Sequence, residues 1–162
     1  MTETVKIVLT IVSTLVLIGI TMVSSLIAIK DVSGTESSTQ NLYVMISIAV
    51  GATAYVIFSA LFSKLFIFLS QLGQEAKQSV SFMNSWYATV VSTLPVGMIN
   101  LFLITVLNLY KNDNKVASII GDLVATFLYT LILRQDGTIT KRTQIIFIVI
   151  SVALGTGMAF AF

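Results

Sequence analysis

Five long apolar blocks, separated by short polar segments, constrain this chain more than any other feature of its sequence. The blocks occupy residues 7–29, 42–69, 82–109, 116–133 and 145–162. An α-helix needs about 20 apolar residues to cross the roughly 30 Å hydrocarbon core of a bilayer. We therefore predict an all-α fold, a polytopic bundle of five transmembrane helices that forms one domain over residues 1–162.

The composition agrees with a lipid environment. Hydrophobic residues make up 56% of the 162-residue chain and charged residues only 10%, whereas soluble domains carry about 25% charged residues. The formal net charge of +2 comes from residues that lie mostly between the apolar blocks, where they would face lipid headgroups. We expect the lipid bilayer as a partner and no nucleic acid.

Two segments allow more than one interpretation. The first apolar block is about as long as a membrane span, exceeds a typical signal-peptide core and precedes no clear cleavage site, so we interpret it as a retained helix. Residues 63–72 continue the second block after an interruption at Ser63 and Lys64. They either extend a long second helix, with Lys64 reaching the interface, or form an amphipathic segment on the membrane surface; we favour the long helix.

The distribution of positive charge predicts an orientation. With five spans, six of the nine Lys and Arg residues fall on the side of the amino terminus and three on the opposite side. Cytoplasmic loops are richer in Lys and Arg. We therefore expect the amino terminus in the cytoplasm and the carboxyl terminus outside.

Several classes of chemistry are excluded by composition. The chain has no cysteine and no histidine, which excludes disulfides, thiol nucleophiles, histidine bases and ordinary zinc sites. We find no phosphate-binding loop, no serine-lysine dyad and no paired acids at helical spacing. The sequence predicts no enzyme, no metal and no cofactor.

Asp122 is the one carboxylate inside an apolar block. A charged carboxylate in hydrocarbon costs at least about 2.5 kcal/mol, so we expect it to face the bundle interior, pair with a base or be protonated. It is either a proton or cation site or an interfacial residue near Lys115. Pro95 predicts a kink or break in the third span. Asn100 follows Pro95 closely in the sequence, and we group these two residues with Asp122 as a candidate polar site.

Two further groups of residues have structural interpretations. Small residues recur at four-residue spacing, which lets helices approach closely in lipid; we expect them to pack helices within the chain, with a dimer face as the alternative. Lys64, Trp86 and Tyr87 are predicted interface anchors. The small residues are Ser47, Gly51, Ser151, Gly155 and Ala159.

The segment from the second to the third block carries a family resemblance. It reads FLSQLG at 68–73, then Phe82, the pair Trp86-Tyr87 and the pair Leu94-Pro95. This pattern resembles the Yip1 family of five-helix membrane proteins. The resemblance implies a membrane accessory or scaffold protein, and bacterial relatives include some that accompany ABC-type efflux systems. The compact loops suit a bacterial plasma membrane.

We expect a non-enzymatic accessory protein that acts through helix-helix contacts with another membrane component, either a transporter or a second copy of itself. One alternative is a small transporter or channel that uses Asp122. Another is an immunity or resistance protein against a membrane-active peptide.

Overall fold

The computed structural model describes the backbone of residues 3–33, 38–74, 79–107 and 115–161. Side chains are described in the same ranges except at 28–33, 38–41, 115–118 and 156–161. The predicted all-α fold is confirmed, because these ranges form five helices joined by short connections. They are α1 (Glu3–Ser33), α2 (Ser38–Ser70), α3 (Phe82–Leu107), α4 (Lys115–Gln135) and α5 (Lys141–Ala161).

Three stretches of the described helices are long and apolar enough to cross a membrane. They are Glu3–Ile27 in α1, Leu42–Ser70 in α2 and Phe82–Leu107 in α3. Large apolar side chains on all five helices are exposed, as expected where lipid takes the place of water. These features support a membrane protein.

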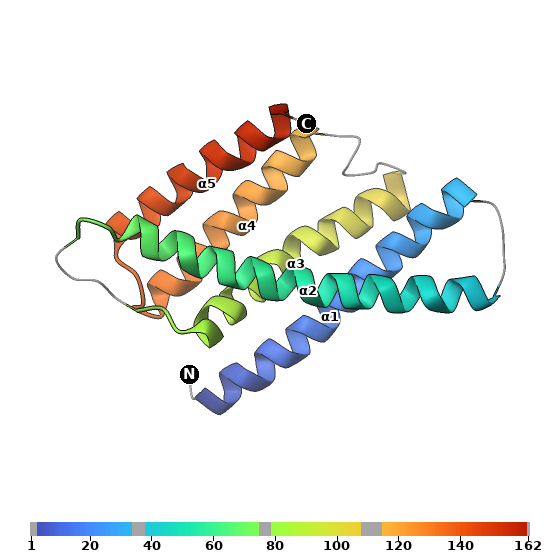
Figure 1. Cartoon of the computed structure of the whole chain (residues 1–162), viewed down its shortest axis with the longest axis horizontal. Helices are drawn as coiled ribbons and strands as arrows, with labels where there is room; N and C mark the ends of the chain where they lie inside the picture. The colour runs from blue at the N-terminus through green and yellow to red at the C-terminus, as the bar shows by residue number, and fades with distance from the viewer. Residues whose placement is uncertain (1–2, 34–37, 75–78, 108–114, 162) are drawn as a thin grey trace.

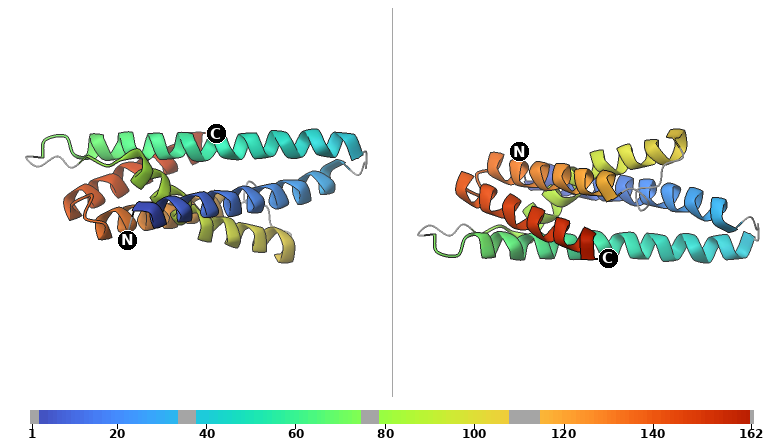
Figure 2. Two further views of the ribbon diagram at one scale, coloured as in Figure 1. Left: turned by 90° about the horizontal axis from the view of Figure 1, so that it is seen from below. Right: turned by 90° about the horizontal axis from the view of Figure 1, so that it is seen from above.

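Four helices lie side by side and the fifth crosses them. Figure 1 shows α1, α3, α4 and α5 running along one diagonal, with α2 passing over them, and the edge views in Figure 2 place α2 on one face of this layer. Helix α3 is central, since it packs against α1, α2 and α4, while α5 packs against α4 and α2.

Polar contacts bring several helix ends together at one end of the bundle, which we call the amino-terminal end. The Lys6 Nζ of α1 donates a hydrogen bond to Asn84 Oδ1 of α3 (3.0 Å) and forms an ion pair with Asp136, just after α4 (2.5 Å). Gln74, after α2, accepts hydrogen bonds from Thr140 and Thr143 at the start of α5. Successive helices along the chain therefore run in opposite directions, and the neighbours α1 and α3 run in the same direction.

Local sequence explains where the helices at this end begin and stop. The Ser81 Oγ accepts a hydrogen bond from the Asn84 N–H and caps α3, and the Thr140 Oγ1 caps α5 through the Thr143 N–H. Gly137 has a φ of 71°. Its N–H bonds to the Arg134 carbonyl and the next N–H to Leu133, which is a Schellman stop. The chain therefore turns at Asp136-Gly137.

Two expectations about helix continuity have different outcomes. Helix α2 runs without interruption through Ser63 and Lys64 to Ser70, which confirms the long helix. Helix α3 also continues across Pro95, so no break occurs. The Pro95 ring lies at an exposed position, and the Ser92 and Thr93 hydroxyls both donate to the Thr89 carbonyl in the turn before it.

Two apolar clusters hold the bundle together. One joins α1, α2 and α3 through Leu17, Val56 and Val90, with Trp86 and Leu94 against it. The other, which we call the floor cluster, lies toward the amino-terminal end and joins α2, α3, α4 and α5. Its buried residues are Ile67, Val80, Ala88, Tyr129, Leu133, Ile139 and Phe147.

Candidate functional site

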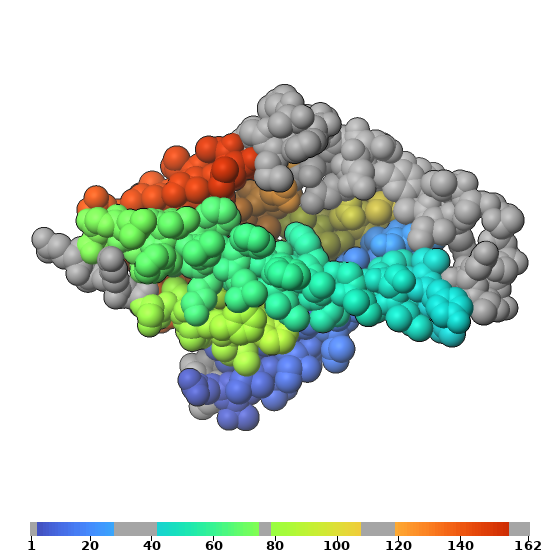
Figure 3. All heavy atoms as spheres, in the orientation of Figure 1, coloured from blue at the N-terminus to red at the C-terminus, as the bar shows by residue number. Residues whose placement is uncertain are grey.

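A cavity of about 360 Å³ lies between α2, α3, α4 and α5, and we call it the chamber. Its volume is within the range of pockets that hold small organic ligands. Figure 3 views the face that carries α2, where atoms of α4 are visible between α2 and α5. The chamber is lined by Tyr55, Ser59, Phe62, Ser63, Phe66, Thr89, Ser92, Thr93, Asp122, Ala125, Thr126, Tyr129, Phe147, Ser151 and Leu154.

Each helix contributes its lining residues from one face. On α4 these are Asp122, Thr126 and Tyr129, and on α5 they are Phe147, Ser151 and Leu154. Such spacing of three or four residues places side chains on one stripe of a helix. The four stripes meet because α2 crosses the layer over the groove between α3, α4 and α5.

The chamber wall is rich in hydroxyls and carries one negative group. Nine of the fifteen lining residues are Ser, Thr or Tyr, Asp122 supplies a carboxylate, and no Lys or Arg is among the described residues that line it. The Thr89 hydroxyl is notable because the residue is only 7% exposed and its Oγ1 has no hydrogen-bond partner in the described part of the chain. A buried hydroxyl without a partner loses its hydration at a cost, and a bound polar ligand would restore that interaction.

Aromatic rings form the other part of the wall. Five lining residues are aromatic: Tyr55, Phe62, Phe66, Tyr129 and Phe147. The Tyr129 and Phe147 rings stack with their centroids 5.5 Å apart and belong to the floor cluster. The chamber therefore combines ring faces, hydroxyls and a single carboxylate.

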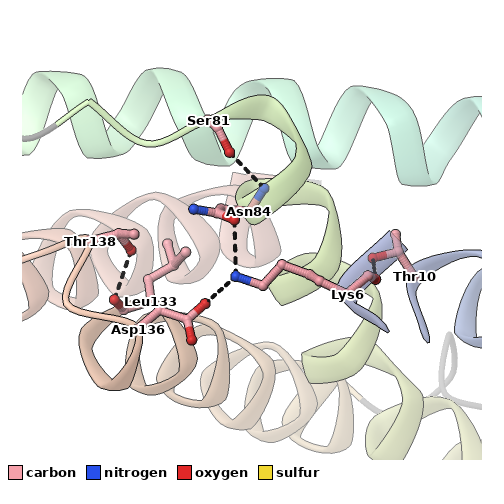
Figure 4. Close-up of polar contacts among 7 residues, drawn as sticks. All are labelled: Lys6, Thr10, Ser81, Asn84, Leu133, Asp136 and Thr138. Atoms are coloured by element: carbon pink, nitrogen blue, oxygen red, sulfur yellow. Dashed lines mark hydrogen bonds and ion pairs between the residues drawn. The ribbon is translucent and has the colours of Figure 1, made fainter. Parts of the chain in front are cut away.

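Hydrogen bonds join three helices between the chamber and the amino-terminal end. The Ser85 Oγ donates to the Ala60 carbonyl (2.7 Å) and lies 2.9 Å from the Tyr129 hydroxyl, so α2, α3 and α4 are joined beneath it. A polar layer follows, in which Arg134 donates to Gln144 and Gln144 donates to Thr130. The outermost contact is the group around Lys6, shown in Figure 4 between the Asn84 amide oxygen and the Asp136 carboxylate.

Toward the opposite end the chamber meets two other cavities. It shares Asp122, Thr126 and Ser151 with a cavity of about 190 Å³ between α4 and α5. It shares Tyr55 and Thr93 with one of about 370 Å³ between α1, α2 and α3. Asp122 is exposed, so the carboxylate stands at the mouth of the chamber and the stacked rings at its base.

The structure separates the three residues of the predicted polar site. Asp122 lines the chamber, but Asn100 lines the neighbouring cavity beside α1, where its Oδ1 is buried without a partner among the described residues. Pro95 is exposed and lines none of these cavities. Within the described residues, no group of three or more His, Cys, Asp or Glu could hold a metal ion.

Most of the predicted packing residues that the structure describes lie at exposed positions. Ser47, Gly51 and Gly155 are exposed, and a Cβ at either glycine would meet nothing within 4 Å. Ser151 lines the chamber, and the packing role of these residues stays a prediction. The side chain of Ala159 is outside the described residues. Close packing occurs at Gly97, where a Cβ would lie 3.5 Å from Leu17 and Ile20 of α1.

The three predicted anchors occupy different environments. Lys64 is exposed near the carboxyl end of α2, beside Ser79 and Val80. Trp86 packs inward against the cluster of Leu17, Val56 and Val90, and its Nε1 has no partner in the described part of the chain. The Tyr87 ring lies 5.5 Å from the Lys6 Nζ.

Most of the hydroxyl wall was missed by the sequence analysis, which identified Asp122 and Ser151 but not Thr89 or Tyr129. A signal was present, because Ser59 and Ser63 on α2 recur at helical spacing, as do Asp122 and Thr126 on α4. Nothing in the order of residues, however, indicates that these stripes face one another.

Comparisons with models of protein families, with curated proteins and with solved structures give no match to this chain.

Proposed function

We propose that the protein is a small, non-enzymatic membrane transporter whose chamber binds a cationic solute, with Asp122 as the coupling carboxylate. The observation that carries this proposal is the chamber itself, a polar cavity inside an apolar bundle. Ionisable and polar groups are costly at membrane depth and mark substrate or ion pathways. A cavity with one carboxylate and no basic lining residue favours positive charge.

In this proposal all five helices cross the plasma membrane, with the amino terminus in the cytoplasm. The mouth of the chamber then faces outward, and the floor cluster with its polar layer separates the chamber from the cytoplasm. Transport requires that this barrier open, as in alternating access. The chamber is bounded by α2 and α3 on one side and by α4 and α5 on the other. The barrier would therefore open by separation of the pair α4 and α5 from the other three helices.

The absence of cysteine makes solvent access to the chamber testable. Ser59→Cys and Phe58→Cys place single thiols at adjacent positions of α2, of which only Ser59 lines the chamber and Phe58 is exposed on the outer surface. A membrane-impermeant, cationic methanethiosulfonate reagent added outside should label the thiol at 59 at least about tenfold faster than the thiol at 58, because a thiolate forms in water and not in lipid. Equal, slow labelling would contradict a water-filled chamber.

Transport is then measured in proteoliposomes under an imposed potassium diffusion potential. The probes are protons, rubidium and choline, each followed separately. At least one should cross faster than in empty liposomes, and Asp122→Asn should reduce that flux at least about tenfold. Glu3→Gln, which removes a carboxylate at an exposed position of α1, is the control. No flux above empty liposomes, or equal flux in the Asp122 variant, would eliminate this function.

A second candidate function is the accessory role expected from the sequence. It is favoured by the small residues Ser47 and Gly51 on the exposed surface of α2, since such a surface allows another helix to approach closely. Purification in mild detergent should then recover a stoichiometric membrane partner or a homo-oligomer, and Gly51→Leu should release it. A monomer without a partner would count against this role.

A further inference from the structure

We infer that the solute of the chamber is an organic ammonium ion, bound by the aromatic rings together with the Asp122 carboxylate and the free Thr89 hydroxyl. This inference rests on the chamber being the functional site and adds the chemical class of its ligand. Three features carry it: the charge of the wall, the rings, and the arrangement of the hydroxyls.

The single carboxylate in the chamber wall favours a ligand with one positive charge. Asp122 is the only acidic or basic side chain among the described lining residues, since the others are hydroxyl-bearing, aromatic or aliphatic. The carboxylate would repel an anion. A divalent cation would have its two positive charges balanced by only one carboxylate and would find too few oxygen ligands of its preferred type. A monovalent cation matches.

The rings distinguish an organic from an inorganic cation. Tyr55, Phe62 and Phe66 from α2 face the same cavity as Tyr129 of α4 and Phe147 of α5. Ring faces attract ammonium groups, which carry their charge on a large and weakly hydrated surface. They cannot replace the water shell of a small metal ion, which requires several oxygen atoms at short distance.

The hydroxyls do not form such an oxygen cage. The Ser92 and Thr93 hydroxyls already donate to the Thr89 carbonyl. Asp122 and Tyr129 are seven residues apart on α4, about 10 Å along the helix axis. Thr89 Oγ1 is the exception, because it is buried without a partner in the described part of the chain. Thr89 lines the chamber, and we infer that its hydroxyl bonds a polar group on the ligand, while the volume of about 360 Å³ fits an organic molecule.

Two probes of one shape test the inference directly. Choline has a quaternary ammonium group and a hydroxyl, and 3,3-dimethyl-1-butanol replaces the charged nitrogen by carbon. Isothermal titration of the purified full chain in detergent should show choline binding at least about tenfold tighter than the neutral isostere or potassium. Equal binding of choline and the isostere, or of choline and potassium, would overturn the inference.

Matched variants locate the site. Phe62 and Phe58 lie one turn apart on α2 with 56% and 59% of their surface exposed, but only Phe62 lines the chamber. Phe62→Leu should weaken choline binding about threefold to tenfold, as expected for one lost ring contact, and Phe58→Leu should leave it unchanged. Asp122→Asn should weaken it at least about tenfold, with partial recovery in Asp122→Glu. Circular dichroism and gel filtration establish that each variant is folded.

The result separates this inference from the proposed function. Flux of protons or rubidium that depends on Asp122, without choline binding, would overturn the inference and leave the transporter standing. Choline binding that depends on Phe62 and Asp122, without flux of any probe, would support the site and refute transport.

Discussion

Thr89 is the clearest example of a side chain placed at a cost to stability. Its hydroxyl is enclosed by the bundle and bonds to no group in the described part of the chain, although its own carbonyl accepts from two neighbours. A threonine hydroxyl in a helix can bond to the carbonyl four residues before it, as Thr93 does. The Thr89 hydroxyl makes no such bond in the described part of the chain, although the residue lines the chamber.

We predict that Thr89→Val raises the free energy of unfolding by about 1 kcal/mol, because it removes a buried polar atom that has no partner and keeps the shape of the side chain. Thr93→Val removes a hydroxyl that is hydrogen-bonded and should not stabilise the protein. Unfolding by denaturant in detergent micelles compares the two. Destabilisation by Thr89→Val would mean that the hydroxyl has a structural partner.

Among individual residues of the chamber, the sequence predicted Asp122 but few of the residues around it. Asp122 is conspicuous because a charge inside an apolar block is costly. Thr89 and Ser59 resemble many other small polar residues in the chain, and their role depends on which helices are neighbours. Asn100 was grouped with Asp122 by proximity in sequence to Pro95, but the two residues line different cavities.

Helix elements were more predictable than their contacts. The apolar blocks gave the number of helices and the long α2, since length and hydropathy are local properties. The small residues at four-residue spacing did not include Gly97, where α3 comes close to α1. Of the two alternatives at Pro95, the break does not occur, because a helix in a bundle can continue past a missing N–H when its neighbours hold it in place; the kink stays a prediction.

We predict that Gly97→Leu destabilises the bundle by about 1–3 kcal/mol, the usual cost of overpacking. A Cβ at this position already touches Leu17 and Ile20 at 3.5 Å, so the remaining carbons would separate α1 from α3. Gly97→Ala should be tolerated.

The control for this prediction is Gly51→Leu on α2, where a side chain enters open space. It should leave the unfolding free energy within about 0.5 kcal/mol of the parent. Equal effects at the two glycines would show that Gly97 is not a close contact between helices.

For the whole molecule, we predict that reporters distinguish the two ends of the bundle. Alkaline phosphatase fused after Phe162 should be active and green fluorescent protein at the same site dark, since only the former matures outside the cytoplasm. Fusions within the turn at Asp136-Gly137 should give the opposite result. Five spans alternate the sides of successive connections, and the excess of Lys and Arg sets which side is cytoplasmic. The same reporter active at both sites would refute five spans.

The order of the helices along the chain determines when the chamber is completed during synthesis. Helices α1, α2 and α3 contact one another, whereas α4 packs against them mainly through α3 and α5 mainly through α2. During synthesis the first three helices leave the ribosome first and can associate in the bilayer while the chain is still growing. The wall supplied by Asp122, Tyr129 and Phe147 arrives last. A nascent protein therefore contains no finished cavity until its final hairpin inserts, and until then the hydroxyls of α2 and α3 face lipid or the insertion machinery.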